Sequence, residues 1–287
     1  MSRAHVVGFS GGIDSQACAL WVRREFPGET IYLVNSDAGG NEHPITTAFL
    51  AAYSAAVHPV VMLTPRLSDM PGVGSVNGAR AALGKGEHDP MTFGDLAALK
   101  GRFPSSQAQF CTTWLKLAPT RRWHAETFDG TDCEVVRYAG VRADESRARA
   151  KLPATEWDDY FDCELRRPIL AWTKQECFDA VTDAGEEFNA LYKLGFSRVG
   201  CAPCVNAGKD DVRRWAAAFP EMIDKVREWE AQAGRTFFPP ITAGRINWID
   251  EVVTWSKTTR GGRQFELPII EAVAASGGCN SNYGICE

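Results

Sequence analysis

The feature that most constrains the fold is the alternation of short apolar runs with helical patterns near the start of the chain. Apolar runs at 4–9, 30–37 and 59–64 alternate with segments at 16–26 and 44–57 whose apolar residues recur at helical spacing. Such β-α-β-α-β alternation predicts a parallel sheet, with ligands bound at the carboxyl ends of its strands. We therefore expect an α/β fold.

The remaining pattern suggests two domains. Residues 65–91 contain five glycines and three prolines and predict a long irregular connection. Further elements are expected as helices at 92–100 and 112–127 and a strand at 133–141. Helical patterns ended by Gly or Pro dominate after residue 170. We predict a nucleotide-binding domain over 1–170 and a helical, cysteine-bearing C-terminal lobe over 171–287.

Composition narrows the class of protein. The 287 residues are 45% hydrophobic and 23% charged, which is typical of a folded globular protein rather than a disordered or fibrous one. A net charge of -5 argues against general affinity for polyanions. The sequence shows no apolar stretch of about 18 residues and no signal-like start, so we expect a cytoplasmic protein with no membrane contact. Nine cysteines in such a chain indicate reduced thiols or metal ligands rather than disulfides.

The sharpest local signal is a glycine loop between the first strand and the first helix, with the sequence Ser10-Gly11-Gly12-Ile13-Asp14-Ser15. Consecutive glycines let backbone N–H groups converge on an anion, and the helix N-terminus adds its dipole. The hydroxyls of Ser10 and Ser15 are further donors. Neither a Walker loop nor a dinucleotide fingerprint is present, because the required Lys and Gly spacings are missing. An ordinary strand-to-helix turn is the alternative.

The string SGGxDS resembles the pyrophosphate loop of the adenine-nucleotide alpha-hydrolase (PP-loop) superfamily. Further elements resemble those of the phosphoadenosine phosphosulfate (PAPS) reductase family and occur in the same order, namely Asp37 to Pro44, Gly140 to Ser146, Arg167 to Thr173, and Asn189 to Tyr192 ahead of Gly200-Cys201. The resemblance covers roughly residues 5–215. It implies a Rossmann-like parallel sheet and a bound adenine nucleotide, either ATP or PAPS/APS, with Mg2+ as a possible companion.

The resemblance also implies which residues bind the nucleotide. Besides the glycine loop, these are Asp37, Gly39, Arg142, Arg147 and Arg149. Guanidinium groups bind phosphate or sulfate bidentately, so the arginines can close over an anionic ligand. The alternative is a solvated charged loop, in which the arginines pair with Asp144 and Glu145.

The sequence indicates residues for acid-base chemistry and metal binding less specifically than it indicates the nucleotide site. Asp14 and Asp37 are candidates for a Mg2+ water shell or for ribose contacts. Asp14 and Arg142 are also the candidate catalytic pair. His43 is a candidate proton donor or merely the first residue of a helix, and we favour the helix.

Cysteine spacing predicts a metal centre. Cys201-Ala202-Pro203-Cys204 forms a CxxC, and Cys111 precedes Lys116 and Pro119 as in the C-C-x-x-x-K-x-x-P element of the family's iron-sulfur members, except that Thr112 replaces the second cysteine. A [4Fe-4S] cluster normally has four thiolate ligands. One arrangement therefore uses Cys111, Cys201, Cys204 and one of the tail cysteines Cys279 and Cys286. Another places Cys201, Cys204, Cys279 and Cys286 around zinc or a cluster, and a metal-free redox CxxC is the third reading.

The other cysteines are interpreted by their positions. Cys18, Cys133 and Cys177 fall inside helix or strand patterns, so we expect them to be small buried hydrophobic residues. Cys163 is left undecided.

Two reaction branches remain open. The resemblance to classical reductases implies attack by a C-terminal cysteine, here Cys286, although its Tyr283-Gly284-Ile285-Cys286-Glu287 context departs from the E-C-G-[LI]-H motif. The sequence FPSSQAQFCTTWLKLAP is similar to the sulfurtransferases of DNA phosphorothioation, which implies adenylylation by ATP followed by sulfur transfer. The implied partners are a sulfur donor protein or a thioredoxin-like reductant, with nucleic acid as a possible substrate.

Two other classes of function stay open. One is a nucleotide-binding regulatory subunit with a structural zinc site. The other is a zinc-stabilised nucleic-acid-binding module that uses the basic residues Lys209, Arg213, Arg214 and Arg227.

Overall fold

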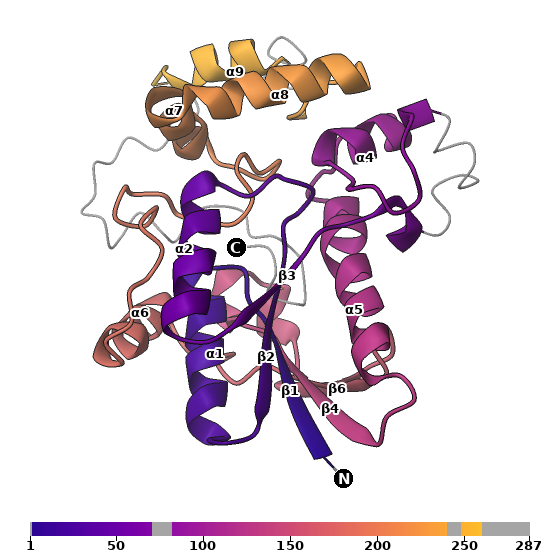
Figure 1. The fold of residues 1–287 in the computed structure, drawn as a ribbon. Coiled ribbons are helices and arrows are strands. Elements are labelled where there is room, and N and C mark those ends of the chain that lie inside the picture. The colour runs from indigo at the N-terminus through magenta and orange to yellow at the C-terminus, as the bar shows by residue number, and fades with distance from the viewer. Residues whose placement is uncertain (1, 71–81, 240–247, 260–287) are drawn as a thin grey trace.

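A computed structural model describes residues 2–70, 82–239 and 248–259. Its centre is a six-stranded sheet with strand order β3-β2-β1-β4-β6-β5 (Figure 1). The strands are β1 (Ser2–Gly8), β2 (Thr30–Ser36), β3 (Val60–Leu63), β4 (Cys133–Tyr138), β5 (Thr155–Asp158) and β6 (Cys163–Arg166). Neighbouring strands are parallel except β5, which runs antiparallel to β6. The expected α/β fold is confirmed, and the expectation of a purely parallel sheet is corrected at this edge.

The β5–β6 hairpin was missed by the sequence pattern. Its strands have four residues each, and they are rich in charged side chains, so alternation of apolar and polar residues is weak. The turn between them contains Asp162 at a φ of 56°, a conformation that Asp tolerates better than most residues. The strand expected at 133–141 also ends earlier, at Tyr138.

Helices cover both faces of the sheet (Figure 1). On one side lie α1 (Ile13–Glu25), α2 (Pro44–Ala56) and α6 (Lys174–Asp183), and on the other lies α5 (Ala118–Phe128). Successive strand residues point to opposite faces, so Val7 packs in the core under α1 and α2 while Val6 packs with Phe128 of α5. The sheet is thus buried on both faces, as its apolar runs require.

A layer of helices lies beyond the carboxyl ends of the parallel strands (Figure 1). It consists of α4 (Phe93–Lys100), α7 (Lys209–Ala218), α8 (Pro220–Ala233) and α9 (Ile249–Ser256). The rings of Phe93 and Trp229 are 5.0 Å apart between centroids, which joins α4 to α8. At Gly94 a Cβ would lie 2.4 Å from Trp229 Cδ1, so only glycine permits this approach. The layer therefore combines a segment from before residue 170 with helices from after it.

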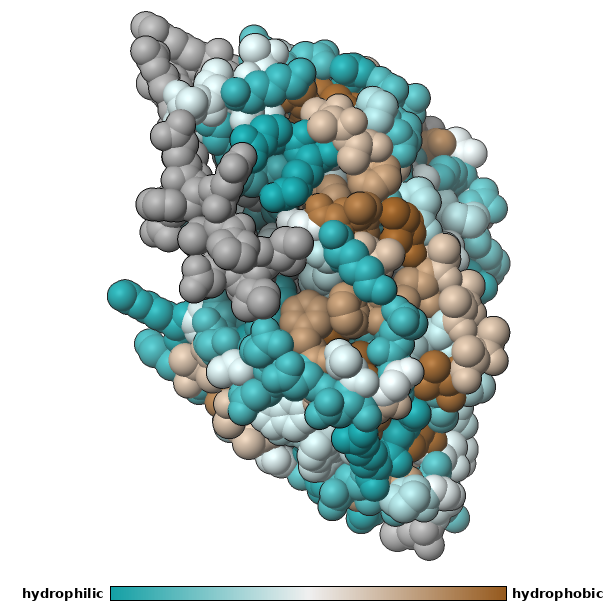
Figure 2. Space-filling model, turned by 90° about the vertical axis from the view of Figure 1, so that its left-hand side faces the viewer, coloured by the Kyte–Doolittle hydropathy of each residue, from teal (hydrophilic) through white to brown (hydrophobic). Residues whose placement is uncertain are grey.

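In the described part of the connection expected at 65–91, Leu67–Asp69 form a short 3-10 helix, η1, and residues 82–83 are helical, while residues 71–81 lie outside the described part of the chain. Within the described residues, no helix is both long enough and apolar enough to span a bilayer. Figure 2 shows a face on which apolar residues lie in patches between hydrophilic ones.

Candidate functional site

The glycine loop turns the chain from β1 into α1. Gly11 has a φ of 81°, a left-handed conformation that favours glycine, and Gly12 is the N-cap of α1. The hydroxyl of Ser15 accepts from Ser10 N at 3.2 Å and donates to the carbonyl of Gly12 at 2.9 Å. The hydroxyl of Ser10 donates to the Ser15 hydroxyl oxygen at 3.1 Å. The two serines therefore hold the loop as a closed turn at the helix N-terminus.

A buried ion pair lies directly behind this loop. Arg142 Nε is 2.7 Å from Asp14 Oδ2, and the two residues are 4% and 2% exposed. Burial alone would lower the pKa of Arg142, but the charge of Asp14 and its hydrogen bond keep that pKa above its ordinary value. The other oxygen, Asp14 Oδ1, has no hydrogen-bond partner among the described residues. The candidate catalytic pair is thus in contact.

The arginine loop is folded onto its own carboxylates. It forms η3 (Ala143–Glu145) and η4 (Arg149–Lys151). Arg142 pairs with Asp144 as well as Asp14, and Arg149 pairs with Glu145. Arg149 is 1% exposed, whereas Arg147 is exposed. The alternative interpretation is therefore correct that the arginines pair with Asp144 and Glu145. It is wrong that the loop is solvated, because Arg142 and Arg149 are buried.

The residues after β2 form a second tight turn. Gly39 N donates to Asp37 Oδ1 at 2.9 Å, and burial raises the pKa of the Asp37 carboxyl. Gly39 has a φ of 71°, and a Cβ there would lie 2.7 Å from Phe93 N. This turn therefore fixes α4 against the edge of the sheet that carries the glycine loop.

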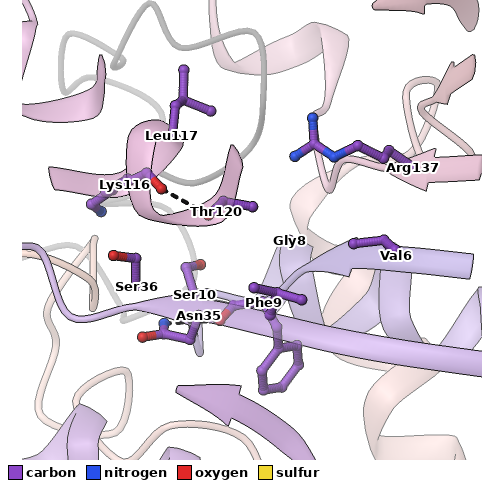
Figure 3. A pocket seen from close by; sticks show the side chains of 11 residues that line it. Val6, Gly8, Phe9, Ser10, Asn35, Ser36, Lys116, Leu117, Thr120 and Arg137 are labelled. Atoms are coloured by element: carbon purple, nitrogen blue, oxygen red, sulfur yellow. Dashed lines mark hydrogen bonds between the residues drawn. The ribbon is translucent and has the colours of Figure 1, made fainter. Parts of the chain in front are cut away.

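A pocket opens between the glycine loop and α5 (Figure 3). Polar side chains of Ser10, Asn35, Ser36 and Thr120 line it, together with the cationic residues Lys116 and Arg137. Both cations are only 4% exposed. Arg137 Nη1 is 3.0 Å from Asp158 Oδ2, and its guanidinium lies 3.3 Å from the centroid of the Phe161 ring.

Sequence reasoning missed Arg137 and used Lys116 only to align a motif. Arg137 stands in the run Glu134-Val135-Val136-Arg137-Tyr138, directly after two apolar residues of the strand. In a strand, residues two apart point to the same face, so Arg137 shares the face of buried Val135. A cation on a buried face is the signal that could have identified Arg137 as a site residue.

The N-x-L-Y element links the later part of the chain to the loop. The hydroxyl of Tyr192 accepts from Ile13 N, the first amide of α1, at 3.0 Å. Asn189 Nδ2 donates to Thr46 Oγ1 of α2 at 2.9 Å. Both side chains are buried, so this element positions the N-termini of α1 and α2.

The CxxC lies against the turn that follows β2. The backbones of Cys201 and Glu42 pair in an isolated antiparallel β-bridge, and Ala202 N donates to the carbonyl of Asn41 at 2.8 Å. Glu42 is 4.0 Å from Lys116 Nζ, which belongs to the π-helix η2 (Thr112–Leu117) directly after Cys111. Burial lowers the pKa of Lys225. Electrostatic interactions with Glu42, Asp37 and Cys201 raise this pKa, but by less than burial lowers it.

The metal prediction concerns five cysteines. Within the described residues, no group of three or more His, Cys, Asp or Glu side chains is arranged to hold a metal ion. Cys111, Cys201 and Cys204 form neither a disulfide nor such a group there, while Cys279 and Cys286 lie outside the described residues.

The remaining assignments are settled by burial. Cys18 and Cys177 are fully buried, which confirms the expectation for both. Cys133, at the start of β4, is only partly buried but packs against the core cluster that contains Phe128, so the expectation is confirmed there in part. Cys163 is buried, and burial raises the pKa of its thiol to about 11. The helix interpretation of His43 is confirmed, since it is the N-cap of α2 and its Nδ1 accepts from Ile45 N at 3.0 Å.

Comparison with known proteins gives a family. The family model of the phosphoadenosine phosphosulfate reductase domain matches residues 97–207. An uncharacterized 37.8 kDa protein of Escherichia phage 186 is 33% identical over 100% of this chain and 97% of its own length. Adenosine 5'-phosphosulfate reductases of Allochromatium vinosum and Streptomyces coelicolor are 35% and 38% identical, over 43% and 27% of this chain and 47% and 34% of their own lengths. This chain thus spans less than half of either reductase.

Among solved structures, the phosphate complex of a PAPS reductase from Candida auris has a TM-score of 0.44 at 18% identity, covering 70% of this chain and 81% of that one. The family model and the reductase relatives point to the same family. The chain belongs to the phosphoadenosine phosphosulfate reductase family.

Proposed function

We propose that this protein is an enzyme of sulfur metabolism that binds an adenine nucleotide, ATP or PAPS/APS, across the glycine loop. The observation that carries the proposal is the geometry of that loop, in which a left-handed Gly11 and the N-cap Gly12 bring a helix N-terminus to the carboxyl end of β1. Backbone N–H groups and the helix dipole at such a position favour phosphate. The reductase relatives support sulfur chemistry at the same site.

The residues around the loop have distinct roles in this proposal. Arg142 holds Asp14 in one orientation through the 2.7 Å ion pair, and Asp14 Oδ1 would then be available to a nucleotide-bound Mg2+, for which carboxylate oxygen is a suitable ligand. Lys116 and Arg137 place positive charge in the adjoining pocket. Arg147 and Arg149 approach the outer phosphate or sulfate once the ligand is bound.

Two reactions fit this site. The reductase relatives favour reduction of a sulfonucleotide, with Cys286 or a thioredoxin-like protein supplying electrons. The alternative is adenylylation of an acceptor by ATP, followed by transfer of sulfur from a donor protein. Turnover assays separate them, because reduction releases sulfite whereas adenylylation releases pyrophosphate.

Gly12→Leu tests the nucleotide site itself. We expect calorimetry to show affinity for ATP, APS or PAPS reduced at least tenfold, because the side chain would stand where the phosphate meets the helix N-terminus. Gly208→Leu is a matched control, since Gly208 is also an N-cap, with φ and ψ of -75° and 165° against -83° and 160° at Gly12. Equal affinities in Gly12→Leu and the control would remove the site from this loop.

Metal analysis after anaerobic purification tests the cysteines. We expect iron and acid-labile sulfide, lost in both Cys201→Ser and Cys204→Ser because the two-residue gap lets both sulfurs reach one cluster. Loss in Cys111→Ser as well assigns the first arrangement, and retention there assigns the set with Cys279 and Cys286. A colourless protein with stoichiometric zinc would contradict the cluster, and a metal-free protein would contradict both arrangements.

A further inference from the structure

A second pocket lies within the helical layer, away from the glycine loop. Its cavity volume is about 350 Å³. Val212, Phe238 and Trp255 form apolar walls, and Ser105, Asn206 and Lys209 contribute polar groups. None of its lining residues lines the pocket at the glycine loop. A mostly apolar cavity with a few convergent polar groups is the usual form of a small-ligand site.

One cation is fixed at an aromatic wall of this pocket. Lys209 Nζ lies 4.6 Å from the centroid of the Trp255 ring and donates to the carbonyl and hydroxyl oxygens of Thr258. Val212 and Phe238 are buried, so the opposite wall is apolar as well. A ligand in the pocket therefore meets the Trp255 ring and, over one face of it, a positive charge.

The described carboxylates near this pocket pair with other side chains and not with Lys209. Asp210 pairs with Arg213 at 3.0 Å, and Asp250 of α9 pairs with Arg227 at 2.7 Å. The carboxylate of Asp211 accepts from the Ser197 hydroxyl at 3.3 Å. Among the described residues that line the pocket, Lys209 is the charged one, so the pocket favours a ligand with negative charge.

We propose that this pocket binds a nucleobase together with its phosphate. The base stacks on Trp255, its phosphate lies at Lys209, and its polar edge meets Asn206 and Ser105. Asn206 has both a donor and an acceptor in its side-chain amide, as does the edge of a base. A purely aliphatic ligand would leave these polar groups without partners, and stacking on an aromatic ring holds any base.

The pocket also adjoins the CxxC. Asn206 N donates to Cys204 Sγ at 3.4 Å, so a base held by Asn206 lies near these cysteines. The nucleotide comes either free in solution or as an unpaired unit of a single strand, since both present the same base and phosphate. This site is independent of the adenine nucleotide proposed for the glycine loop.

Binding to the full-length protein tests the proposal with uridine monophosphate and with a fluorescein-labelled eight-residue oligothymidylate as probes. We expect Trp255→Leu to weaken binding of the recognised probe at least tenfold through lost stacking. Lys209→Gln should weaken it several-fold and reduce its salt dependence, whereas Lys257→Gln, an exposed lysine two residues beyond Trp255, leaves it unchanged. Trp255→Phe retains a ring and should restore most of the affinity.

The outcomes separate the sources and the sites. Binding of uridine monophosphate alone identifies a free nucleotide as the ligand, and tight binding of the oligonucleotide alone identifies a strand. Gly12→Leu should lose ATP but retain the probe, so failure of the glycine-loop proposal is distinguishable from failure of this one. Absence of binding by both probes, or wild-type affinity in folded Lys209→Gln and Trp255→Leu, would overturn the proposal. If Trp255→Leu does not fold, the affinity of Lys209→Gln compared with that of the wild-type protein tests the proposal.

Discussion

Replacing Gly140 by alanine is expected to lower the free energy of unfolding by about 2 kcal/mol or more, and to weaken nucleotide binding with it. A Cβ at this position would lie 2.6 Å from the carbonyl oxygen of Asp14 and 2.8 Å from Ser15 Cα. These are backbone atoms, which cannot rotate away as the end of a side chain can. The first turn of α1 would have to move away from β4, and the glycine loop would move with it. Urea unfolding and calorimetry with ATP measure the two effects.

Gly208→Ala is the control for loss of a glycine. The nearest atom to a Cβ at Gly208 is 4.0 Å away, and its backbone is extended, so neither a clash nor strain arises. We expect a change within about 1 kcal/mol, as for an ordinary change at an N-cap. Wild-type stability in Gly140→Ala would mean that β4 and α1 do not approach as closely as described.

The sequence was sufficient where structure depends on local chemistry. The apolar runs of β1, β2 and β3 and the helical spacing of α1 and α2 predicted the first half of the sheet, because both patterns repeat within a few residues. The glycine loop was predictable for the same reason, since two glycines and two serines between a strand and a helix permit few conformations. The order of the motifs then placed Asp14 and Arg142 at one edge of the sheet, where the structure pairs them.

Sequence was insufficient where the contact is remote along the chain. The packing of Phe93 on Trp229 joins residues far apart in sequence, and neither helix pattern specifies its partner. Arg137 is buried because Asp158 and Phe161 of the β5–β6 hairpin surround its guanidinium, and that hairpin has too little apolar alternation to be recognised. Buried charge follows from such remote pairing, which composition and periodicity do not encode.

Arg142→Ala is expected to cost about 3 kcal/mol of the free energy of unfolding and to weaken nucleotide binding at least tenfold. Removing one member of a buried ion pair leaves the other charge without compensation, and Asp14 is only 2% exposed. Arg147→Ala is the matched control for stability only, because Arg147 lies in the same loop but is exposed, so its loss should change the free energy of unfolding by less than about 0.5 kcal/mol. Urea unfolding and calorimetry with ATP again measure the two quantities.

A double variant separates the stabilising role of the pair from its role in binding. In Asp14→Asn with Arg142→Met both charges are removed together, so no uncompensated charge remains and much of the lost stability should return. Nucleotide affinity should remain low, because the carboxylate oxygen that meets the ligand and the guanidinium that orients it are both absent. Recovery of both stability and affinity would mean that the pair serves only the fold. Wild-type affinity in Arg142→Ala would leave the arginine loop as an internally paired segment with no part in nucleotide binding.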